Sequence, residues 1–298
     1  MPEVTPQTED RRIRLADGRA IGFAEFGEAE GFPCLYFHGW PGSRLEAGLF
    51  EEAAREQGLR LIAVDRPGVG RSEFQTKRRP VDWPHDIETL ASALGLSRFA
   101  VLGYSAGAPY ALACASRFPD RLVSTTLIAG LGPLDAAEAC RSLPPWMRFV
   151  FALCHRAHGL AVPLFGLFAQ RLRPSPERLF PRWFLESLAP SDRAVLGGAE
   201  VRGLFHASVM EAFRAGPRGV AWEGALLARP WGFSVDAIRC PVMLWHGEAD
   251  HEVPVTMARR LAARLSTVRT WFLPDEGHFS LPVRHQHAIL GEVKRSIG

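Results

Sequence analysis

The sequence predicts an α/β protein in which a mostly parallel central sheet is flanked by helices and interrupted by one helical insertion. Two observations predict the sheet. From Pro33 onward, short apolar runs alternate with segments of helical spacing, and this alternation favours parallel strands joined by right-handed crossovers. One apolar run also stops abruptly at Gly103-Tyr104-Ser105-Ala106-Gly107 and continues as a helix. A third observation predicts the insertion, because no strand pattern occurs between Leu131 and Val235.

The composition is typical of a globular protein with a large core. The chain has 298 residues, of which 47% are hydrophobic, and a net charge of +3. Its basic residues are scattered along the chain, which argues against nucleic-acid binding. The five cysteines have neither C-x-x-C nor Cys/His metal spacing and are predicted to be buried free thiols in a reducing compartment: Cys34, Cys114, Cys140, Cys154 and Cys240.

No segment predicts a secretory signal or a membrane span. Residues 1–10 are polar and acidic, unlike a signal peptide. The longest apolar segment, Gly159 to Ala169, is interrupted by Pro163 and is too short to cross a bilayer. We therefore expect a soluble, cytoplasmic protein. The sequence does not indicate its oligomeric state.

Strands alternate with helices over the first part of the chain. The first two strands are predicted to be antiparallel and joined by a turn at Asp17-Gly18, and the later ones are more apolar and more buried. The predicted strands are Arg12–Leu15, Ala20–Phe26, Pro33–Phe37, Leu59–Val64, Phe99–Leu102 and Leu122–Ala129. Helices are predicted over Leu45–Gln57 and Asp86–Leu94, and from Tyr110 through Cys114.

The insertion is predicted to be a helical cap. Between residues 131 and 235, short helical segments rich in Phe, Trp, Leu and Arg are separated by prolines and glycines. Alternation then resumes with a strand over Cys240–Trp245, a helix over Thr256–Leu265, a strand over Val268–Leu273 and a final helix through Gln286 to Ile297. We divide the chain into a core, residues 1–130 and 236–298, and a cap, residues 131–235. Connections of this length usually have a function.

Ser105 occupies the centre of the strand–turn–helix pattern G-x-S-x-G. Gly103 and Gly107 flank it because a Cβ at either position would collide with neighbouring backbone in so tight a turn. Ser105 is then expected to have strained dihedral angles and to hold its hydroxyl above the sheet. By itself the pattern is a weak signal, because an ordinary glycine-rich turn has the same residues.

Four motifs in order make the chain resemble the α/β-hydrolase fold. They are His38-Gly39-Trp40-Pro41-Gly42, Asp65-Arg66-Pro67-Gly68-Val69-Gly70-Arg71-Ser72, Gly103 to Gly107, and Gly247-Glu248-Ala249-Asp250 with a later Gly277-His278. The resemblance covers the whole core, and the insertion falls where that family carries its cap. It implies a nucleophile, an acid and a base in that chain order, namely Ser105, Asp250 and His278.

The chemistry of acyl transfer requires each of these roles. A serine hydroxyl becomes a nucleophile when a neighbouring imidazole, here His278, takes its proton. Asp250 would hold that imidazole in the right tautomer and stabilise the imidazolium. The resemblance assigns the oxyanion hole to the backbone N–H groups of Trp40 and Ala106. Such a mechanism needs no metal and no cofactor.

The insertion is also predicted to form the substrate pocket. It carries more large apolar residues than thin surface helices can bury among themselves, so some of them should cover the carboxyl edge of the sheet. We expect Trp40, Tyr104, Phe165 and Phe205 to line the pocket. We also expect a cis peptide bond between Trp40 and Pro41, because proline lowers the cost of the cis form to about 0.5–1 kcal/mol.

Other residues compete for the acid and base roles. Glu248 is an alternative acid, although the family's spacing from the glycine favours Asp250. His278 competes with four other histidines, of which the first is predicted inside a strand motif and the last two on a helix surface: His246, His251, His285 and His287. The residues His38, Asp65 and Arg66 are expected to brace the loops beneath the site through hydrogen bonds.

The predicted function is hydrolysis of small to medium carboxylic esters through an acyl-enzyme on Ser105. Serine at this position argues against the dehalogenase and epoxide-hydrolase branches, which use a carboxylate. A carbon–carbon bond hydrolase would use the same triad. A proline iminopeptidase-like enzyme usually has glycine where this chain has Trp40, and no acidic cluster that would hold an amine is evident in the insertion. Trp40-Pro41 mildly favours perhydrolase activity, and some members of the fold are non-catalytic ligand-binding receptors.

Overall fold

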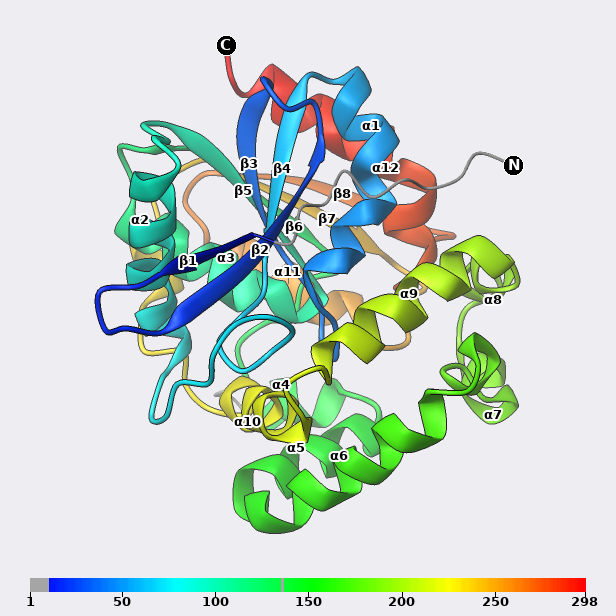
Figure 1. Ribbon diagram of the computed structural model, residues 1–298. Coiled ribbons are helices and arrows are strands. Elements are labelled where there is room, and N and C mark those ends of the chain that lie inside the picture. Colours follow the sequence, from blue (N-terminus) through cyan, green and yellow to red (C-terminus); the bar gives the residue numbers. More distant parts are fainter. Residues whose placement is uncertain (1–10, 135–136) are drawn as a thin grey trace.

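The fold is built on an eight-stranded sheet with the strand order β1-β2-β4-β3-β5-β6-β7-β8 (Figure 1). The computed structural model describes residues 11–134 and 137–298, so residues 1–10, for which the sequence predicts no signal peptide, lie outside the described residues. The strands are β1 (Arg11–Arg14), β2 (Ala20–Gly27), β3 (Phe32–Phe37), β4 (Leu59–Val64), β5 (Phe99–Tyr104), β6 (Leu122–Ile128), β7 (Val242–Gly247) and β8 (Val268–Leu273). The pairs β1–β2 and β2–β4 are antiparallel, and all other pairs are parallel. The predicted α/β class with a mostly parallel sheet is confirmed.

Helices cover both faces of the sheet, which explains why β5 and β6 are buried at every position. One face packs against α2 (Trp83–Ala93), α3 (Ala108–Arg117) and α11 (Val255–Arg264). The other face packs against the 3-10 helix η1 (Arg44–Phe50), α1 (Glu51–Glu56) and α12 (Ser280–Arg295). Each face therefore has its own apolar core.

Several helix boundaries differ from the prediction. The helix expected over Leu45–Gln57 is divided into η1 and α1. The helix α12 begins at Ser280, well before the predicted Gln286, and α2 begins before Asp86. In both cases a proline lies in the first turn, Pro282 in α12 and Pro84 in α2. Proline is tolerated there because the first N–H groups of a helix have no partner within it.

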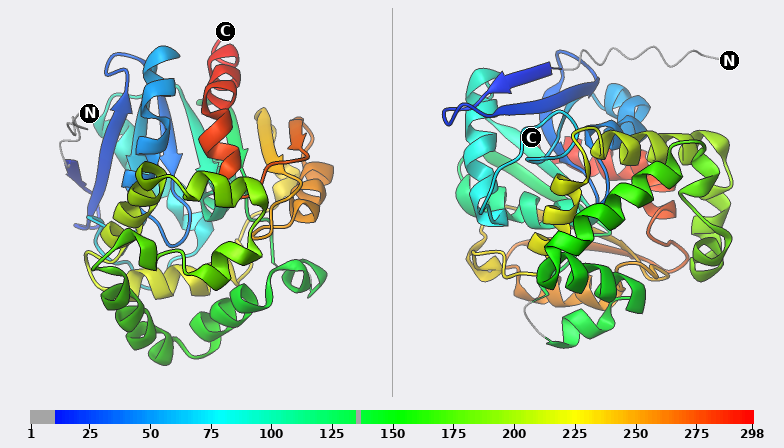
Figure 2. Two further views of the ribbon diagram at one scale, coloured as in Figure 1. Left: turned by 90° about the vertical axis from the view of Figure 1, so that its right-hand side faces the viewer. Right: turned by 60° about the horizontal axis from the view of Figure 1, so that its bottom comes forward.

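Every regular element in the described part of the insertion is a helix, and these helices gather at one end of the strands (Figures 1 and 2). It comprises α4 (Ala137–Ser142), α5 (Pro145–Arg156), α6 (His158–Leu172), the short turn η4 (Pro176–Arg178), α7 (Arg182–Ser187), α8 (Pro190–Leu196), α9 (Ala199–Ala212) and α10 (Pro217–Leu227). The sequence places a break at Pro163, but α6 continues through it. Proline removes a backbone hydrogen bond there, and the packing of α6 against α5 and α10 supports the helix.

The cysteines are free thiols, but one of them differs from the prediction. Cys34, Cys114, Cys154 and Cys240 are buried, whereas Cys140 is only half-buried. This residue belongs to α4, a short helix of the insertion. Within the described residues, no helix combines the length and the apolar character that crossing a membrane requires.

Candidate active site

The turn between β5 and α3 has the strained geometry expected for a nucleophile. Ser105 has a φ of 52°, in the left-handed region that few residues other than glycine adopt. A Cβ on Gly103 would lie 2.7 Å from the carbonyl oxygen of Gly107, and one on Gly107 would clash with the carbonyl oxygen of Phe37. Glycine is therefore required on both sides of Ser105, as predicted.

Three residues that are far apart in the chain form a continuous hydrogen-bond relay. His278 Nε2 lies 3.0 Å from Ser105 Oγ, and His278 Nδ1 lies 2.8 Å from Asp250 Oδ2. The other oxygen of Asp250 accepts hydrogen bonds of 2.8 Å from the backbone N–H groups of Glu252 and Val253. Asp250 is thus held by its own turn after β7, and it orients the imidazole toward Ser105.

The charges in this relay shift the pKa values of its members. Burial alone would lower the pKa of His278, but the charge of Asp250 and the hydrogen bond to it raise this pKa to about 9. Burial alone would raise the pKa of Asp250, and the charge and hydrogen bond of His278 outweigh burial and lower it. The two residues therefore favour an ion pair, which is the arrangement that stabilises an imidazolium.

Glu248 and the four other histidines that compete for the acid and base roles have other partners in the structure. The Glu248 carboxylate forms an ion pair with Arg259 instead of meeting His278. The other histidines bind the following groups: His246 the carbonyl of Val253, His251 the carbonyl of Ser187, His285 the carboxylate of Glu276, and His287 the carboxylate of Glu56. Only His246 approaches the relay, with its Nε2 3.5 Å from Asp250 Oδ2.

The loop after β3 lies beside Ser105 and is braced from several sides. The Trp40–Pro41 peptide bond is cis, as predicted. Arg66 donates to the carbonyl oxygens of His38 and Gly39 at 2.6 and 3.0 Å, and the backbone N–H of Gly39 donates to Glu46 at 2.6 Å. His38 itself bonds the Gly39 carbonyl through Nδ1. Burial raises the pKa of Glu46 to about 7.

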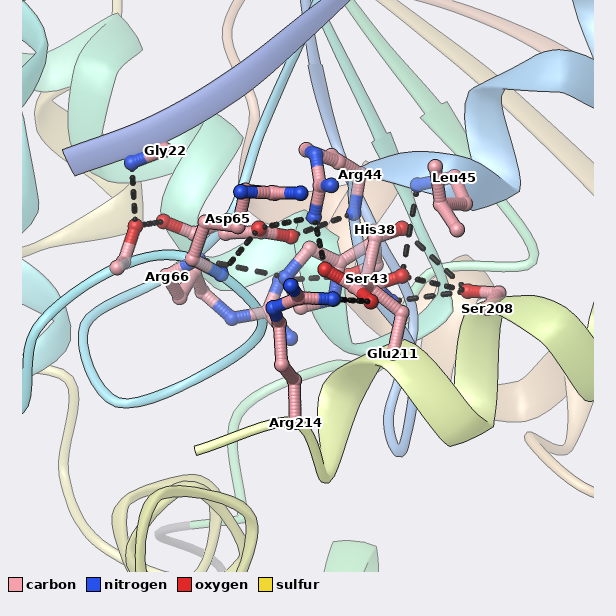
Figure 3. Close-up of polar contacts among 12 residues, drawn as sticks. Gly22, His38, Ser43, Arg44, Leu45, Asp65, Arg66, Ser208, Glu211 and Arg214 are labelled. Carbon is pink, nitrogen blue, oxygen red and sulfur yellow. Dashed lines mark hydrogen bonds and ion pairs between the residues drawn. The ribbon is translucent and has the colours of Figure 1, made fainter. Parts of the chain in front are cut away.

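Asp65 lies at the centre of a polar network beneath this loop (Figure 3). Its carboxylate accepts hydrogen bonds from the backbone and side chain of Arg44, each at 2.7 Å, and from the backbone N–H of Arg71. Arg44 also contacts Glu211 of α9 at 2.7 Å, and the Ser43 backbone donates to Ser208 of the same helix. The bracing role expected for Asp65 and Arg66 is therefore seen, and it extends into the insertion.

A cavity of about 740 Å³ opens above Ser105 and His278, between the loops of the core and the insertion. The four residues expected to line a pocket, Trp40, Tyr104, Phe165 and Phe205, all lie in its wall. The Trp40 ring contacts Phe151 and Phe165, and its indole N–H donates to the Val220 carbonyl at 2.8 Å. The lining is mostly apolar, which suits an uncharged acyl chain.

Comparison with known proteins agrees with this geometry. A family model described as the alpha/beta hydrolase fold matches residues 33–284. The chain belongs to the α/β-hydrolase fold family. A non-heme chloroperoxidase from Streptomyces lividans is 28% identical over 124 residues, 41% of this chain and 45% of that protein. A proline iminopeptidase from Xylella fastidiosa is 33% identical over 131 residues, 42% of this chain and 41% of that protein. The matches thus span less than half the length of these curated relatives.

A similar solved structure matches nearly the whole length of this chain. A thermophilic esterase from Thermogutta terrifontis has a TM-score of 0.68 at 22% identity, and the match covers 96% of this chain and 99% of that one. At this identity the likeness shows the fold.

Three further acidic residues lie in or beside the site, and no sequence motif predicted them. Asp192 of α8 accepts hydrogen bonds of 2.8–2.9 Å from the backbone N–H groups of His278, Phe279 and Ser280. Burial raises its pKa. Asp192 therefore holds the start of α12, and with it the backbone of His278, from within the insertion.

Glu223 of α10 forms a second link between insertion and core. Its carboxylate pairs with Arg66 at 2.6 Å, with Arg78, and with the hydroxyl of Tyr110 at 2.9 Å. Burial alone would raise the pKa of Glu223, but the two guanidinium groups outweigh it and lower the pKa to about 2. Because Arg66 also holds the loop after β3, α10 is coupled to that loop through one ion pair.

The third of these residues, Glu252, lies two residues after Asp250 and lines the cavity. Across the described residues, no group of three or more His, Cys, Asp or Glu side chains is arranged to hold a metal ion. The sequence contains no short motif that singles out Asp192, Glu223 or Glu252, because only the folded chain supplies the partners of Asp192 and Glu223 and the cavity that Glu252 lines.

Proposed function

We propose that this α/β hydrolase is a serine carboxylesterase that cleaves small to medium carboxylic esters. The observation that carries the proposal is the relay in which His278 lies 3.0 Å from Ser105 Oγ and 2.8 Å from Asp250. The Ser105 backbone is strained so that its hydroxyl faces a mostly apolar cavity. A nucleophile, a base and an orienting acid in hydrogen-bond reach are the parts that acyl transfer needs.

In the first step, Ser105 Oγ attacks the ester carbonyl while His278 Nε2 takes its proton. The carbonyl oxygen becomes an oxyanion, which the backbone N–H groups of Trp40 and Ala106 stabilise. His278 then gives the proton to the departing alcohol, and the acyl group stays on Ser105. In the second step, His278 activates water, which releases the acid and restores Ser105.

The size and mostly apolar wall of the cavity support an ester of small to medium size. Its wall is mostly aromatic and aliphatic, and the loop after β3 carries tryptophan at position 40 beside the nucleophile. The structural neighbour from Thermogutta terrifontis is itself described as an esterase. The insertion closes one side of the cavity, so it would select the acyl group.

Labelling with a fluorophosphonate tests the proposal, because this reagent attaches covalently to an activated serine. We expect mass spectrometry to find the adduct on the peptide that contains Ser105, and Ser105→Ala to abolish both the adduct and hydrolysis of 4-nitrophenyl esters. An adduct elsewhere, or none on the folded protein, would contradict the proposal and favour a ligand-binding receptor.

A second set of substrates separates esterase activity from the alternatives on the same triad. Unlabelled protein from the same preparation is compared on an aryl ester, a prolyl anilide, a vinylogous 1,5-diketone, and acetate with hydrogen peroxide. Fastest turnover of the ester supports the proposal. Faster turnover of another substrate class would leave the proposed triad in place but would contradict the proposed ester substrate.

A further inference from the structure

Glu252 is a buried acidic residue whose carboxyl group faces the cavity beside the relay. It is 5% exposed, and its side chain contributes to the cavity wall together with Ser105 and His278. Its backbone N–H donates to Asp250, but among residues 11–134 and 137–298 nothing forms a hydrogen bond or an ion pair with its carboxyl group. Burying a carboxyl group without a partner is unfavourable, so such groups in native structures need an explanation.

The other buried acid of the cavity wall does have partners. Glu46 accepts hydrogen bonds from the Gly39 backbone at 2.6 Å and from the Tyr36 hydroxyl at 3.0 Å, so it has a structural role. Asp192, which lies near Glu252, accepts three backbone hydrogen bonds. Glu252 differs from both because its carboxyl group is directed at the space that a substrate would occupy.

The charged groups around Glu252 are mostly acidic. Those that act on its carboxyl group are His278, Asp250 and Asp192. The remaining charged residues of the cavity wall are the buried Glu46 and three exposed residues at the rim, Arg171, Glu177 and Arg178. The buried part of the wall therefore holds two carboxyl groups, the His278 imidazole and no arginine or lysine, and Glu252 favours a positively charged ligand there once it is ionised.

We propose that Glu252 receives a positively charged ammonium group carried by the ester substrate near its scissile bond. The inference rests on the proposed esterase function and names the substrate class within it. The ammonium group supplies the partner that the carboxylate lacks, and Tyr104, on whose hydroxyl the charge of Glu252 acts, offers an aromatic ring in the same cavity wall.

The charge state of Glu252 provides a way to observe this interaction. Burial raises the pKa of Glu252 to about 8, although the charge of His278 opposes the shift. Without ligand, the carboxyl group is neutral below this pH and negative above it. Attraction of a permanent cation should therefore increase as the pH rises through the pKa of Glu252, whereas binding of a neutral group of the same shape should not.

The test uses two pairs of esters that differ by one charge and hardly in shape. In the first pair the alcohol is 2-(trimethylammonio)ethanol or 3,3-dimethylbutanol, each as the butyrate. In the second pair the acid is trimethylglycine or 3,3-dimethylbutanoic acid, each as the ethyl ester. The measured quantity is the kcat/KM of the charged ester divided by that of its neutral partner. The proton transfers of Ser105 and His278 are common to both esters, so they cancel in this ratio.

For the wild type, we expect the ratio of at least one pair to rise between about pH 7 and about pH 9. In Glu252→Gln, the ratio should fall by about tenfold or more at the upper pH, corresponding to about 1.4 kcal/mol. Glu248→Gln is the matched control, because Glu248 pairs with Arg259 outside the cavity. Titration of His278 or Glu46 would persist in Glu252→Gln, so a rise that survives there does not come from Glu252.

Equal ratios in the wild type and Glu252→Gln for both pairs would overturn the inference. Failure of the esterase proposal gives a different result, since the neutral esters would then also stay intact and Ser105 would not be labelled. In that case, calorimetric binding of phenyltrimethylammonium still tests the site without turnover. Binding that weakens in Glu252→Gln supports it, and equal binding to both proteins refutes it.

Discussion

Asp250 and Glu248 are two residues apart, yet their carboxylates meet different partners. Asp250 is buried and bonds His278, whereas Glu248 pairs with Arg259 at the surface. We predict that Asp250→Asn lowers kcat on an aryl ester by about 10⁴-fold, because the amide would favour the wrong imidazole tautomer. Glu248→Gln should change kcat little. The reverse result would make Glu248 the acid.

The pH profile of ester hydrolysis should follow His278. Only the neutral imidazole can take the Ser105 proton, and the pKa of this residue is raised to about 9. We therefore expect kcat/KM on a neutral ester to rise with pH through the region around 9. Asp250 is the main cause that raises this pKa, so the residual activity of Asp250→Asn should rise at lower pH. An unchanged pH midpoint in Asp250→Asn would contradict the assignment of Asp250 as the partner of His278.

The sequence predicts some residues of the site much better than others. Ser105, Asp250 and His278 lie in short motifs with fixed spacing, and the structure brings these three side chains together. Asp192 and Glu252 could not be predicted, because an isolated acidic residue acquires its role from long-range contacts. The hydrogen bond from His278 to Asp192, for example, joins residues 86 positions apart.

The helix α10 is attached to the core by one buried carboxylate. Glu223 binds Arg66 and Arg78, and both guanidinium groups are almost fully buried. We predict that Glu223→Gln lowers the free energy of unfolding by about 3–5 kcal/mol, because it leaves two buried cations without a counter-charge. Urea unfolding measures this difference. Glu186→Gln is the control, since its pair with Arg182 is exposed and should contribute less than about 1 kcal/mol.

The same substitution should change the response to acid. The pKa of Glu223 is lowered from 4.5 to about 2 in the folded protein. Its stabilising contribution is therefore present above pH 4.5 and is lost as the pH falls toward 2. The stability difference between wild type and Glu223→Gln should shrink over that interval. A difference that stays constant would show that the ion pair is not its source.

Helices and strands could be predicted where the local sequence pattern determines them. The strands β3 to β7 are mostly apolar, β3 and β5 throughout, and the structure places all of them close to the expected bounds. The start of α12 and the continuity of α6 through Pro163 could not be predicted in this way. Both depend on contacts outside the segment, namely Asp192 at the start of α12 and the neighbouring helices around α6.

At the scale of the whole molecule, the cavity between insertion and core should set the acyl length. Each methylene group that enters the apolar cavity adds about 0.8 kcal/mol of binding until the space is filled. We predict that kcat/KM on 4-nitrophenyl esters rises with chain length and then falls sharply. Phe165→Ala or Phe205→Ala should move that maximum, because both residues line the cavity.

Phe149→Ala is the matched control for the chain-length profile, because Phe149 belongs to α5 of the insertion, is 68% exposed and is not part of the cavity wall. It should leave the maximum where it is. A flat profile that no substitution alters would show that the insertion does not select the acyl group.

The strands on either side of the insertion, β6 and β7, are neighbours in the sheet. The two ends of the insertion also lie close together, because Pro133 and Leu134 at its start line the same surface pocket as residues 229–235 at its end. Recombination could therefore exchange this module without disturbing a strand pair. Such an exchange must preserve two contacts between the cap and the core. A transplanted cap must bring a carboxylate to Arg66 and Arg78 and an acceptor to the backbone of His278, as Glu223 and Asp192 do here. New specificity could thus be acquired by grafting only from donors that carry these two anchors.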